Sequence, residues 1–418
     1  MNDRFGRYKT LWVGMLAFFL GASLQTGATG YSMLVAGRLI AGASIGILSG
    51  TVPVFISELA PHHLRGGLGT FFQCGIVTGA LLASLWNMLI QGTVHTANAW
   101  RIQAGLQIVL GGFMALGLAF VPETPRWLAK SGQTDKARST LAKLRGEACA
   151  EVTEAEMKEI EAEVEAEKAC TASIFDLFSK QVIFATMVGL GIQLLQQLTG
   201  MNVFMSYSTT IFNNLCLNGN AFTIAQSLVN FFATFGAIYL SDKFGRKKML
   251  MGASSVMFAV LIISAGLGWG IDMERNVVAA YAIAVLICIF TVAFASAWGP
   301  NGWIIPSEVF PLRLRGKGAG CATFVNWFFC FIVMYTTPLV VNSSMGAEGL
   351  YVIYGIIMAL AIPALLFLMP ETSGVPLEEM EAKFNKPFGD YVKDNAQDLR
   401  RRKPAEAKPL ETDNASKV

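Results

Sequence analysis

The sequence is poor in charged residues, which make up 15% of its 418 positions, whereas hydrophobic residues make up 53%. Soluble domains are about a quarter charged, so an ordinary soluble protein is excluded. The mean hydropathy of +0.49 points the same way. The net charge of +3 is too small to favour nucleic-acid binding, and we expect no nucleic-acid partner. The composition is that of a membrane protein.

Residues and motifs typical of metal sites, disulfides and enzyme active sites are also scarce. The seven cysteines form no CxxC pair, and on the topology argued below only Cys216 faces outside, so no disulfide framework is predicted. The three histidines, His62, His63 and His95, lie in loops and make no credible metal site. No nucleotide-binding loop or nucleophile constellation is present in the sequence. We therefore expect neither an enzyme nor a bound metal or cofactor.

Ten apolar runs dominate the chain, each near the roughly 20 residues that a membrane-spanning helix needs. Their approximate bounds are 10–30, 32–56, 67–91, 100–121, 181–204, 221–240, 249–271, 277–305, 318–340 and 349–369. A transmembrane barrel needs short alternating segments, and these runs are long and continuous. The sequence predicts an all-α polytopic membrane protein with ten transmembrane helices.

The loops between these runs alternate in charge. Lys and Arg gather in 3–9, 62–66, 122–180, 241–248, 311–317 and the tail from 370, whereas the other loops hold Arg275 alone. Positive charge stays on the cytoplasmic side during insertion, so both termini are expected in the cytoplasm. We expect a multi-pass protein in a lipid bilayer, which we take to be the plasma membrane.

Four regions follow from these patterns. They are an amino-terminal bundle of four spans (1–121), a cytoplasmic linker with short helices (122–180), a carboxy-terminal six-helix bundle (181–371) and a cytoplasmic tail (372–418). Linker residues 151–168 are predicted to be helical, with a thin apolar stripe of Met157, Ile160 and Val164. We interpret this segment as a solvated linker helix rather than a latch against the bundle. The tail after Lys386 is predicted to be disordered.

Three local patterns occur twice, in the same order. DRFGR (3–7) returns as DKFGR (242–246), SELAPHHLRG (57–66) as SEVFPLRLRG (307–316), and PETP (122–125) as PETS (370–373). The offsets of 239, 250 and 248 residues are nearly equal, which indicates two parallel repeats. Two spans precede DKFGR in the second repeat, but only two residues precede DRFGR in the first. By this symmetry we expect the first repeat to be incomplete, lacking two helices.

With these motifs the sequence resembles the sugar-porter branch of the major facilitator superfamily. The family's pieces are GR at 37–38, PETPRWL at 122–128, QQLTGMN at 196–202, SDKFGRKK at 241–248, WGPNGW at 298–303, SEVFPLRLRG at 307–316, NW at 326–327 and PETSG at 370–374. The resemblance runs from residue 1 to about residue 384 and corresponds to helices three to twelve of a twelve-helix fold. It implies a substrate cavity between two bundles that opens alternately to each side.

The resemblance also implies a function, namely transport of a monosaccharide by a facilitator or a proton symporter. We interpret the substrate as a hexose. The alternatives are transport of a pentose, polyol or inositol, a sensor that binds sugar without transporting it, and an inactive fragment. In proton-coupled relatives the coupling carboxylate lies on the first helix, which has no counterpart among these spans. None of the ten spans has an acidic residue well inside the membrane, so proton coupling stays open.

A polar cluster interrupts the span at 181–204. Gln193, Gln196 and Gln197 share a helical face, and Asn202 follows Gly200, which can loosen the helix. A sugar needs neutral groups that both donate and accept hydrogen bonds, and amides that face hydrocarbon are costly. We predict that these four amides bind sugar in an internal cavity. The alternative is that they join helices.

By resemblance, five further residues contact the sugar and one forms an outer gate. The sugar contacts are Gln73, Asn230, Trp303, Asn326 and Trp327, and the gate residue is Tyr207. Gly299 and Pro300 can bend the helix that carries Trp303. A lone Trp near the end of a span can also be an interfacial anchor.

Charged residues on the cytoplasmic side are expected to control gating. Ion pairs between the two bundles are predicted for Arg38, Glu58, Arg65, Arg126, Asp242, Arg246, Glu308 and Arg315. Such pairs would form in the outward-open state and break in the inward-open state. Topology alone explains Lys247 and Lys248, but it does not explain why Glu58 and Glu308 recur at equivalent places.

Overall fold

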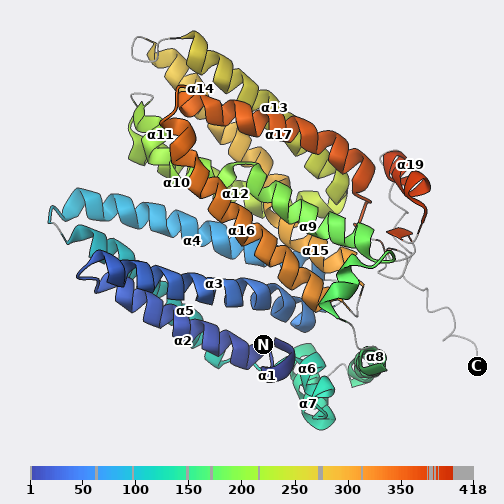
Figure 1. The fold of residues 1–418 in the computed structure, drawn as a ribbon. Coiled ribbons are helices and arrows are strands. Elements are labelled where there is room, and N and C mark those ends of the chain that lie inside the picture. The colour runs from blue at the N-terminus through green and yellow to red at the C-terminus, as the bar shows by residue number, and fades with distance from the viewer. Residues whose placement is uncertain are drawn as a thin grey trace, which may run out of the picture.

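The computed structural model describes residues 2–398 apart from 62–64, 97, 147–149, 170–172, 215–216, 272–275, 312–313, 374, 376–379, 381–382 and 385. Two groups of long helices pack against each other, the first blue to cyan and the second green to orange (Figure 1). Shorter helices gather at one end of these groups, where α1, α6, α7, α8 and α19 all lie.

The first group holds four long helices and the second holds six in the described part of the chain. The first follows a short helix α1 (Asn2–Phe5) and comprises α2 (Arg7–Thr26), α3 (Tyr31–Leu59), α4 (Arg65–Thr93) and α5 (Ala99–Ala119). The second comprises α9 (Ile183–Leu198) with its continuations α10 (Met201–Ser206) and α11 (Ser208–Asn214), then α12 (Gly219–Phe244), α13 (Arg246–Gly270), α14 (Val277–Ala293) with α15 (Gly299–Val309), α16 (Arg315–Val341) and α17 (Gly346–Leu368). All ten predicted spans are helical, and the two groups are unequal as the repeat predicts.

Eight of these helices are long and apolar enough to cross a membrane, judged by length and composition over the described residues. The other two predicted spans, α2 and α12, form helices of 20 and 26 residues. Helix α12 is less apolar because it carries Gln226, Asn230 and Thr234, and all three side chains are buried inside the protein. A span that lines an interior can carry such residues, because their polar atoms do not face lipid.

Two spans are interrupted where glycine was expected to loosen them. Helix α9 ends before Gly200, whose φ of 82° is left-handed, and a Cβ there would lie 2.6 Å from the ring of Tyr354. Between α14 and α15 the chain forms a π turn (Phe294–Trp298) directly before Gly299 and Pro300. Such turns are frequent at functional sites.

The linker forms a small helical domain with its own core. It comprises α6 (Pro125–Lys130), α7 (Thr134–Arg145) and α8 (Ala150–Ala169). The stripe on α8 is buried, with Met157 at 0% and Val164 at 4% exposure, and it packs against apolar residues of α6 and α7, namely Leu128, Ala129, Ala137 and Leu141. The expectation of a solvated linker helix was therefore wrong. Three apolar residues on α8 are enough because two short helices supply the opposing surface.

Arg145 links this domain to the first group of helices. Its Nε and Nη2 donate to the Glu156 carboxylate at 2.8 and 2.7 Å, and its Nη1 donates to the carbonyl of Leu59 at 3.0 Å. Leu59 is the last residue of α3. The hydrogen bond to Glu156 raises the pKa of Arg145 above its ordinary value.

The tail also departs from expectation, because residues Phe388–Asp398 form a helix, α19. Its Tyr391 is 2% exposed, stacks on Phe184 at 5.3 Å and donates from its hydroxyl to the carbonyl of Leu368 at 2.6 Å. Asn395 Nδ2 donates to the carbonyl of Phe367 at 3.1 Å. The prediction of disorder after Lys386 was wrong for this segment, because its aromatic face packs on the second group and caps α17. Residues 399–418 lie outside the described part.

Candidate functional site

A cavity of about 840 Å³ lies between the two groups of helices. Eight of the nine residues predicted to contact substrate line it, namely Gln73, Gln196, Gln197, Asn202, Asn230, Trp303, Asn326 and Trp327. The ninth, Gln193, is 1% exposed and lies behind this wall, where it contacts Asn326. Residues about 250 positions apart in the sequence, such as Gln73 and Asn326, therefore share one cavity.

Asn326 on α16 joins the three glutamines of α9. Its Nδ2 donates to Oε1 of Gln193 and, at 2.8 Å, to Oε1 of Gln196. Its Oδ1 accepts from Nε2 of Gln197 at 2.9 Å. The shared face predicted from the spacing is therefore present, and all four side chains are buried. These amides both join two helices and face the cavity, so the two interpretations of the cluster do not exclude each other.

Asn202 on α10 continues this network beyond the break at Gly200. Its Nδ2 donates to Oε1 of Gln197 at 2.5 Å and contacts Sγ of Cys330 at 3.6 Å. In a continuous helix, residues five apart point about 140° away from each other. The left-handed turn at Gly200 brings Asn202 back to Gln197. Within the described residues, Oδ1 of Asn202 accepts no hydrogen bond.

Two amides elsewhere on the wall have unused polar atoms. Asn230 on α12 is 3% exposed, and its Oδ1 has no partner among the described residues. Within the described part of the chain, its Nδ2 contacts the sulfur of Met205 alone, at 3.4 Å. Gln73 on α4 makes no hydrogen bond within the described part of the chain. A buried polar group without a partner costs about 1–3 kcal/mol, so a ligand that supplies hydroxyl groups is favoured here.

Both predicted indoles contact the opposite group of helices. Trp303 on α15 lies edge-on to Phe72 of α4, with 4.8 Å between ring centroids. Trp327 on α16 donates from Nε1 to Oγ of Ser49 on α3 at 3.0 Å. Neither is a plain interfacial anchor, because each lines the cavity between the groups.

Sequence reasoning missed several lining residues, among them Ser49, Phe72, Gln107, Met205 and Cys330. Gln107 lies in the predicted span 100–121, four residues after Gln103, and this pair of amides within an apolar run was a usable signal. Ser49 and Cys330 are of types that membrane helices carry on any face, so only packing reveals them. No Asp, Glu, Lys or Arg is among the described residues that line the cavity. The cavity therefore suits a neutral ligand rich in hydroxyl groups.

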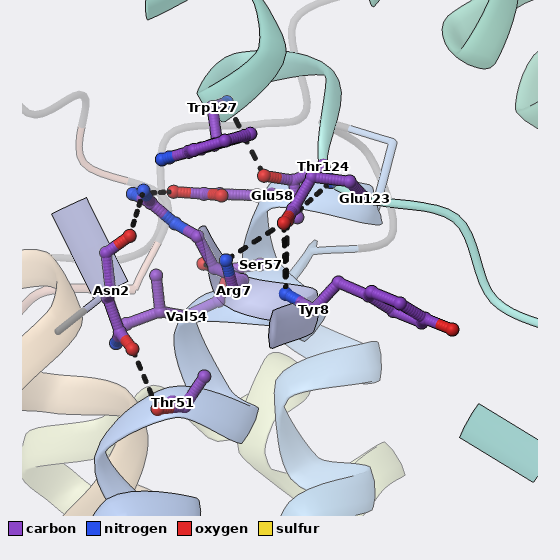
Figure 2. Close-up of polar contacts among 10 residues, drawn as sticks. All are labelled: Asn2, Arg7, Tyr8, Thr51, Val54, Ser57, Glu58, Glu123, Thr124 and Trp127. Carbon is purple, nitrogen blue, oxygen red and sulfur yellow. Dashed lines mark hydrogen bonds and ion pairs between the residues drawn. The ribbon is translucent and has the colours of Figure 1, made fainter. Parts of the chain in front are cut away.

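The charged motifs form the same cluster once in each repeat. In the first (Figure 2), Oε1 of Glu123 accepts from the backbone N–H of Arg7 at 3.1 Å, and Oε2 accepts from that of Tyr8 at 3.1 Å. The Arg7 guanidinium pairs with Glu58 at 2.7 Å, with both side chains 8% exposed. A carboxylate at a helix N-terminus stabilises it, so Glu123 caps α2.

In the second repeat Glu371 accepts from the backbone N–H groups of Arg246 and Lys247 at 3.0 and 3.3 Å, and Arg246 pairs with Glu308. These contacts match those of Glu123, Arg7 and Glu58 one for one.

Both arginines begin a helix after a glycine of positive φ, Gly6 at 92° and Gly245 at 85°. A Cβ on either glycine would meet the capping carboxylate, at 2.2 Å for Glu123 and 2.6 Å for Glu371. The internal repeat is therefore a repeat of structure as well as of sequence.

The ion pairs that the structure describes for Glu58, Arg246 and Glu308 are not the predicted ones between the bundles. Their described pairs each lie within one repeat, because the glycine turn brings the arginine beside the glutamate that ends a neighbouring helix of the same group. The sequence analysis did not select Arg7, Glu123 or Glu371, although the repeated motifs contain them.

Arg38 was also misplaced. It lies seven residues after the start of α3, is exposed, and is separated from Glu58 by 20 helical residues, or about 30 Å. It belongs to the opposite end of the helix from the charged clusters.

The remaining predicted gate residues are less informative. Arg126 and Arg315 begin α6 and α16 at the end that carries the clusters. The side chains of Arg65 and Asp242 lie outside the described residues. Tyr207 directly follows α10 and is partly buried against the core of the second group, without lining the cavity.

Known proteins resemble this chain along most of its length. The family described as sugar (and other) transporter matches residues 1–384. Sugar transport protein 11 of Arabidopsis thaliana is 34% identical over 415 residues, which cover 94% of this chain and 79% of the relative. Hexose transporter 2 of Kluyveromyces lactis is 35% identical over 398 residues, covering 91% and 69% respectively.

A solved structure is also similar. The major facilitator superfamily proton:xylose symporter XylE, bound to 6-bromo-6-deoxy-D-glucose, superposes with a TM-score of 0.78 at 27% identity, covering 92% of this chain and 84% of XylE. The matching family is one of transporters rather than enzymes. With ten long helices in its described part, two parallel repeats and a central cavity, the chain belongs to the sugar transporter family and is a multi-pass membrane protein of the major facilitator fold.

Proposed function

We propose that this protein transports a neutral monosaccharide, a hexose, by alternating access of the central cavity. The observation that carries the proposal is the neutral cavity between the two helical groups, where buried amides keep unused hydrogen-bonding atoms. A hexose presents a ring of hydroxyls, which both donate and accept, and two mildly apolar faces. The amides match the hydroxyls, and the indoles of Trp303 and Trp327 match the faces.

The unused atoms suggest which residues contact the sugar. Oδ1 of Asn230 and Oδ1 of Asn202 accept from hydroxyls, because neither has a donor within the described residues. Gln73 offers both its donor and its acceptor. Gln197 donates one of its two N–H groups to Asn326, which leaves the other N–H for a sugar oxygen. These four amides come from α4, α9, α10 and α12, so the sugar contacts both halves.

The names of the relatives support sugar as the substrate and leave two modes of transport. Sugar and hexose transporters favour a hexose, whereas XylE is a proton:xylose symporter and supports co-transport of a proton. A facilitator is the alternative. We further propose that the end carrying α6–α8 and α19 faces the cytoplasm of the plasma membrane, as the distribution of Lys and Arg predicts.

Sugar binding tests the proposal directly. With the chain in membrane vesicles, D-glucose is expected to quench the fluorescence of the cavity tryptophans saturably, and L-glucose is not. Gln197→Leu removes a hydrogen-bond partner in a dry cavity and should weaken D-glucose binding by about 1–3 kcal/mol, which is about 5- to 150-fold.

Gln133→Leu is the matched control, because Gln133 lies on the small helical domain outside the cavity. Tighter binding of D-xylose or an inositol than of D-glucose would reject the hexose assignment. Equal quenching by L-glucose would argue against a sugar site altogether.

A further inference from the structure

Three exposed apolar residues lie directly before the first helix of the second group. They belong to η3 (Ile174–Phe178), a short 3₁₀ helix between α8 and α9 in the chain. Ile174 is 46% exposed, Phe175 79% and Phe178 61%. Apolar side chains gain free energy when they leave water, so a contiguous exposed group of them marks a surface that binds something apolar.

A capping box shapes this short helix. The backbone N–H of Ser173 donates to the Asp176 carboxylate at 2.7 Å, and Oγ of Ser173 accepts from the backbone N–H of Phe175 at 3.4 Å. In a 3₁₀ helix, residues three apart lie one above the other, so Phe175 and Phe178 share a face. Leu177 is 1% exposed and packs in the core of the second group. The helix therefore has one buried residue and an outer aromatic face.

This aromatic face lies at the end of a membrane span. Oγ1 of Thr186, in the first turn of α9, donates to the carbonyl of Leu177 at 2.7 Å, so η3 packs beside α9. The span that begins at Ile183 has 24 residues, which is about 36 Å of helix. The hydrocarbon core of a bilayer is roughly 30 Å thick, so a centred span ends within a few ångströms of its boundary. Phe175 and Phe178 therefore lie where acyl chains meet headgroups.

Basic residues accompany the aromatic face. Lys180 follows Phe178 by two residues and is exposed. The helix η3 also contacts α16, whose first turn carries Lys317, which is exposed as well. Lysine ammonium groups at a membrane surface attract anionic headgroups, while their aliphatic stems lie along apolar surface. The one acidic residue of η3, Asp176, accepts the N–H of Ser173.

We propose that η3 is a membrane-surface anchor that binds a leaflet containing anionic lipid. Phe175 and Phe178 enter the boundary between headgroups and acyl chains, and Lys180 and Lys317 lie at lipid phosphates. The occupant is lipid because the aromatic face continues the outer surface of α9, where Met187 is 53% exposed and does not line the cavity. The anchor fixes the point at which the linker meets the membrane, whichever solute the cavity binds.

Photocrosslinking in the full chain tests this contact. The chain carries p-benzoylphenylalanine in place of Phe175 or Phe178 and is reconstituted in vesicles of phosphatidylcholine with a minor share of phosphatidylglycerol. After irradiation, mass spectrometry of the peptide that contains η3 should detect covalent lipid adducts at either position. The same amino acid in place of Ala162, an exposed residue of the acidic helix α8, is the control and should give no lipid adduct above background.

The contrary outcomes are distinct. Absence of lipid adducts at Phe175, or equal amounts at Phe175 and Ala162, would overturn the anchor. Adducts of Phe175 with another protein chain instead of lipid would assign the aromatic face to a protein partner and would also overturn it. A chain that binds no sugar should still give the lipid adducts, so this result is independent of the proposed function.

The composition of the adducts tests the lysines. Phosphatidylglycerol should be enriched among the adducts at Phe175 relative to its share of the vesicle lipid, and Lys180→Gln should lower this enrichment about fivefold at low salt. Lys158→Gln, which changes an exposed lysine of α8, is the matched control and should leave the enrichment as it was. Enrichment that persists when Lys180→Gln and Lys317→Gln are combined would contradict the role of the lysines.

Discussion

Gly6 and Gly245 occupy the same place in the two repeats, and each leaves no room for a side chain. Both have positive φ, and both face a carboxylate that caps the next helix. A left-handed conformation in a non-glycine residue costs about 1–3 kcal/mol, and here the clash adds to that cost. The glycines of the repeated motifs are therefore requirements of the Glu123 and Glu371 caps.

Gly6→Ala should accordingly destabilise the protein by more than backbone strain alone. Gly132→Ala is the matched control, because Gly132 has a φ of 81° but nothing within 4 Å of its Cβ position. We expect thermal unfolding in detergent to show a clear loss for both variants, about 1–3 kcal/mol for Gly132→Ala and more for Gly6→Ala. Equal losses of stability in the two variants would mean that the Glu123 carboxylate can move away from the added Cβ at no cost in free energy.

At the scale of elements, α19 is held by a cation that water does not reach. Lys247 is 0% exposed, and its Nζ donates to the carbonyls of Leu366 at 2.8 Å and Asn395 at 2.5 Å. These carbonyls belong to the last turns of α17 and α19, where helix dipoles favour positive charge. Together with Tyr391 and Asn395, Lys247 connects the start of α13, the end of α17 and α19.

Lys247→Met should therefore loosen α19 without unfolding the membrane helices. Leaving buried carbonyls unpaired costs about 1–3 kcal/mol, so exchange of the Phe388–Asp398 amides should rise by about 5- to 150-fold. Lys248→Met changes an exposed neighbour and should leave this exchange as it was. A similar rise in both variants would show that Lys247 does not anchor α19.

At the scale of the whole molecule, the contacts described here between the two groups are neutral. Besides Phe72–Trp303 and Ser49–Trp327, Ser84 pairs with Ser227 at 3.0 Å and Asn220 donates to Gln91 at 2.8 Å. These four contacts are made by uncharged side chains, and the described residues that line the cavity carry no Asp, Glu, Lys or Arg either. The ion pairs Arg7–Glu58 and Arg246–Glu308 each join helices of one group.

Because no charged group is among the described lining residues, D-glucose affinity should not depend on pH. We expect a Kd that is constant within about twofold between pH 5.5 and 7.5, the range in which an imidazole or a raised carboxyl would titrate. Binding of D-glucose measured by tryptophan quenching checks this. A tenfold change across that interval would place a titrating group in contact with the sugar.

The orientation in the membrane has its own test. On the proposed topology an impermeant thiol reagent applied to intact cells should label Cys216 but not Cys149 or Cys170, because only the loop with Cys216 lies outside. A chain carrying Cys216→Ser should then lose that label. Labelling of Cys149 from outside would reverse the topology.

The sequence by itself determined the helical class, the ten segments and the two repeats, and it identified eight of the residues that line the cavity. Hydropathy and repeated motifs are properties of the chain alone, because a helix in lipid must satisfy its own backbone and the apolar runs mark where it can. Gln197 and Asn202 stood out for the same reason, since amides within apolar runs need an interior, whereas Asn230 was predicted only from the resemblance to the family.

Only the tertiary structure decided which side chains contact one another. Whether Glu58 pairs with Arg7 or with a residue of the other repeat depends on the helix packing and on the turn at Gly6. The stripe of α8 and the aromatic face of α19 were too short to identify as buried without the surfaces that cover them. Gln196 and Gln197 are adjacent and have the same side chain, yet their hydrogen-bond partners differ, because Gln196 donates to the carbonyls of Trp298 and Gly299 and Gln197 accepts from Asn202.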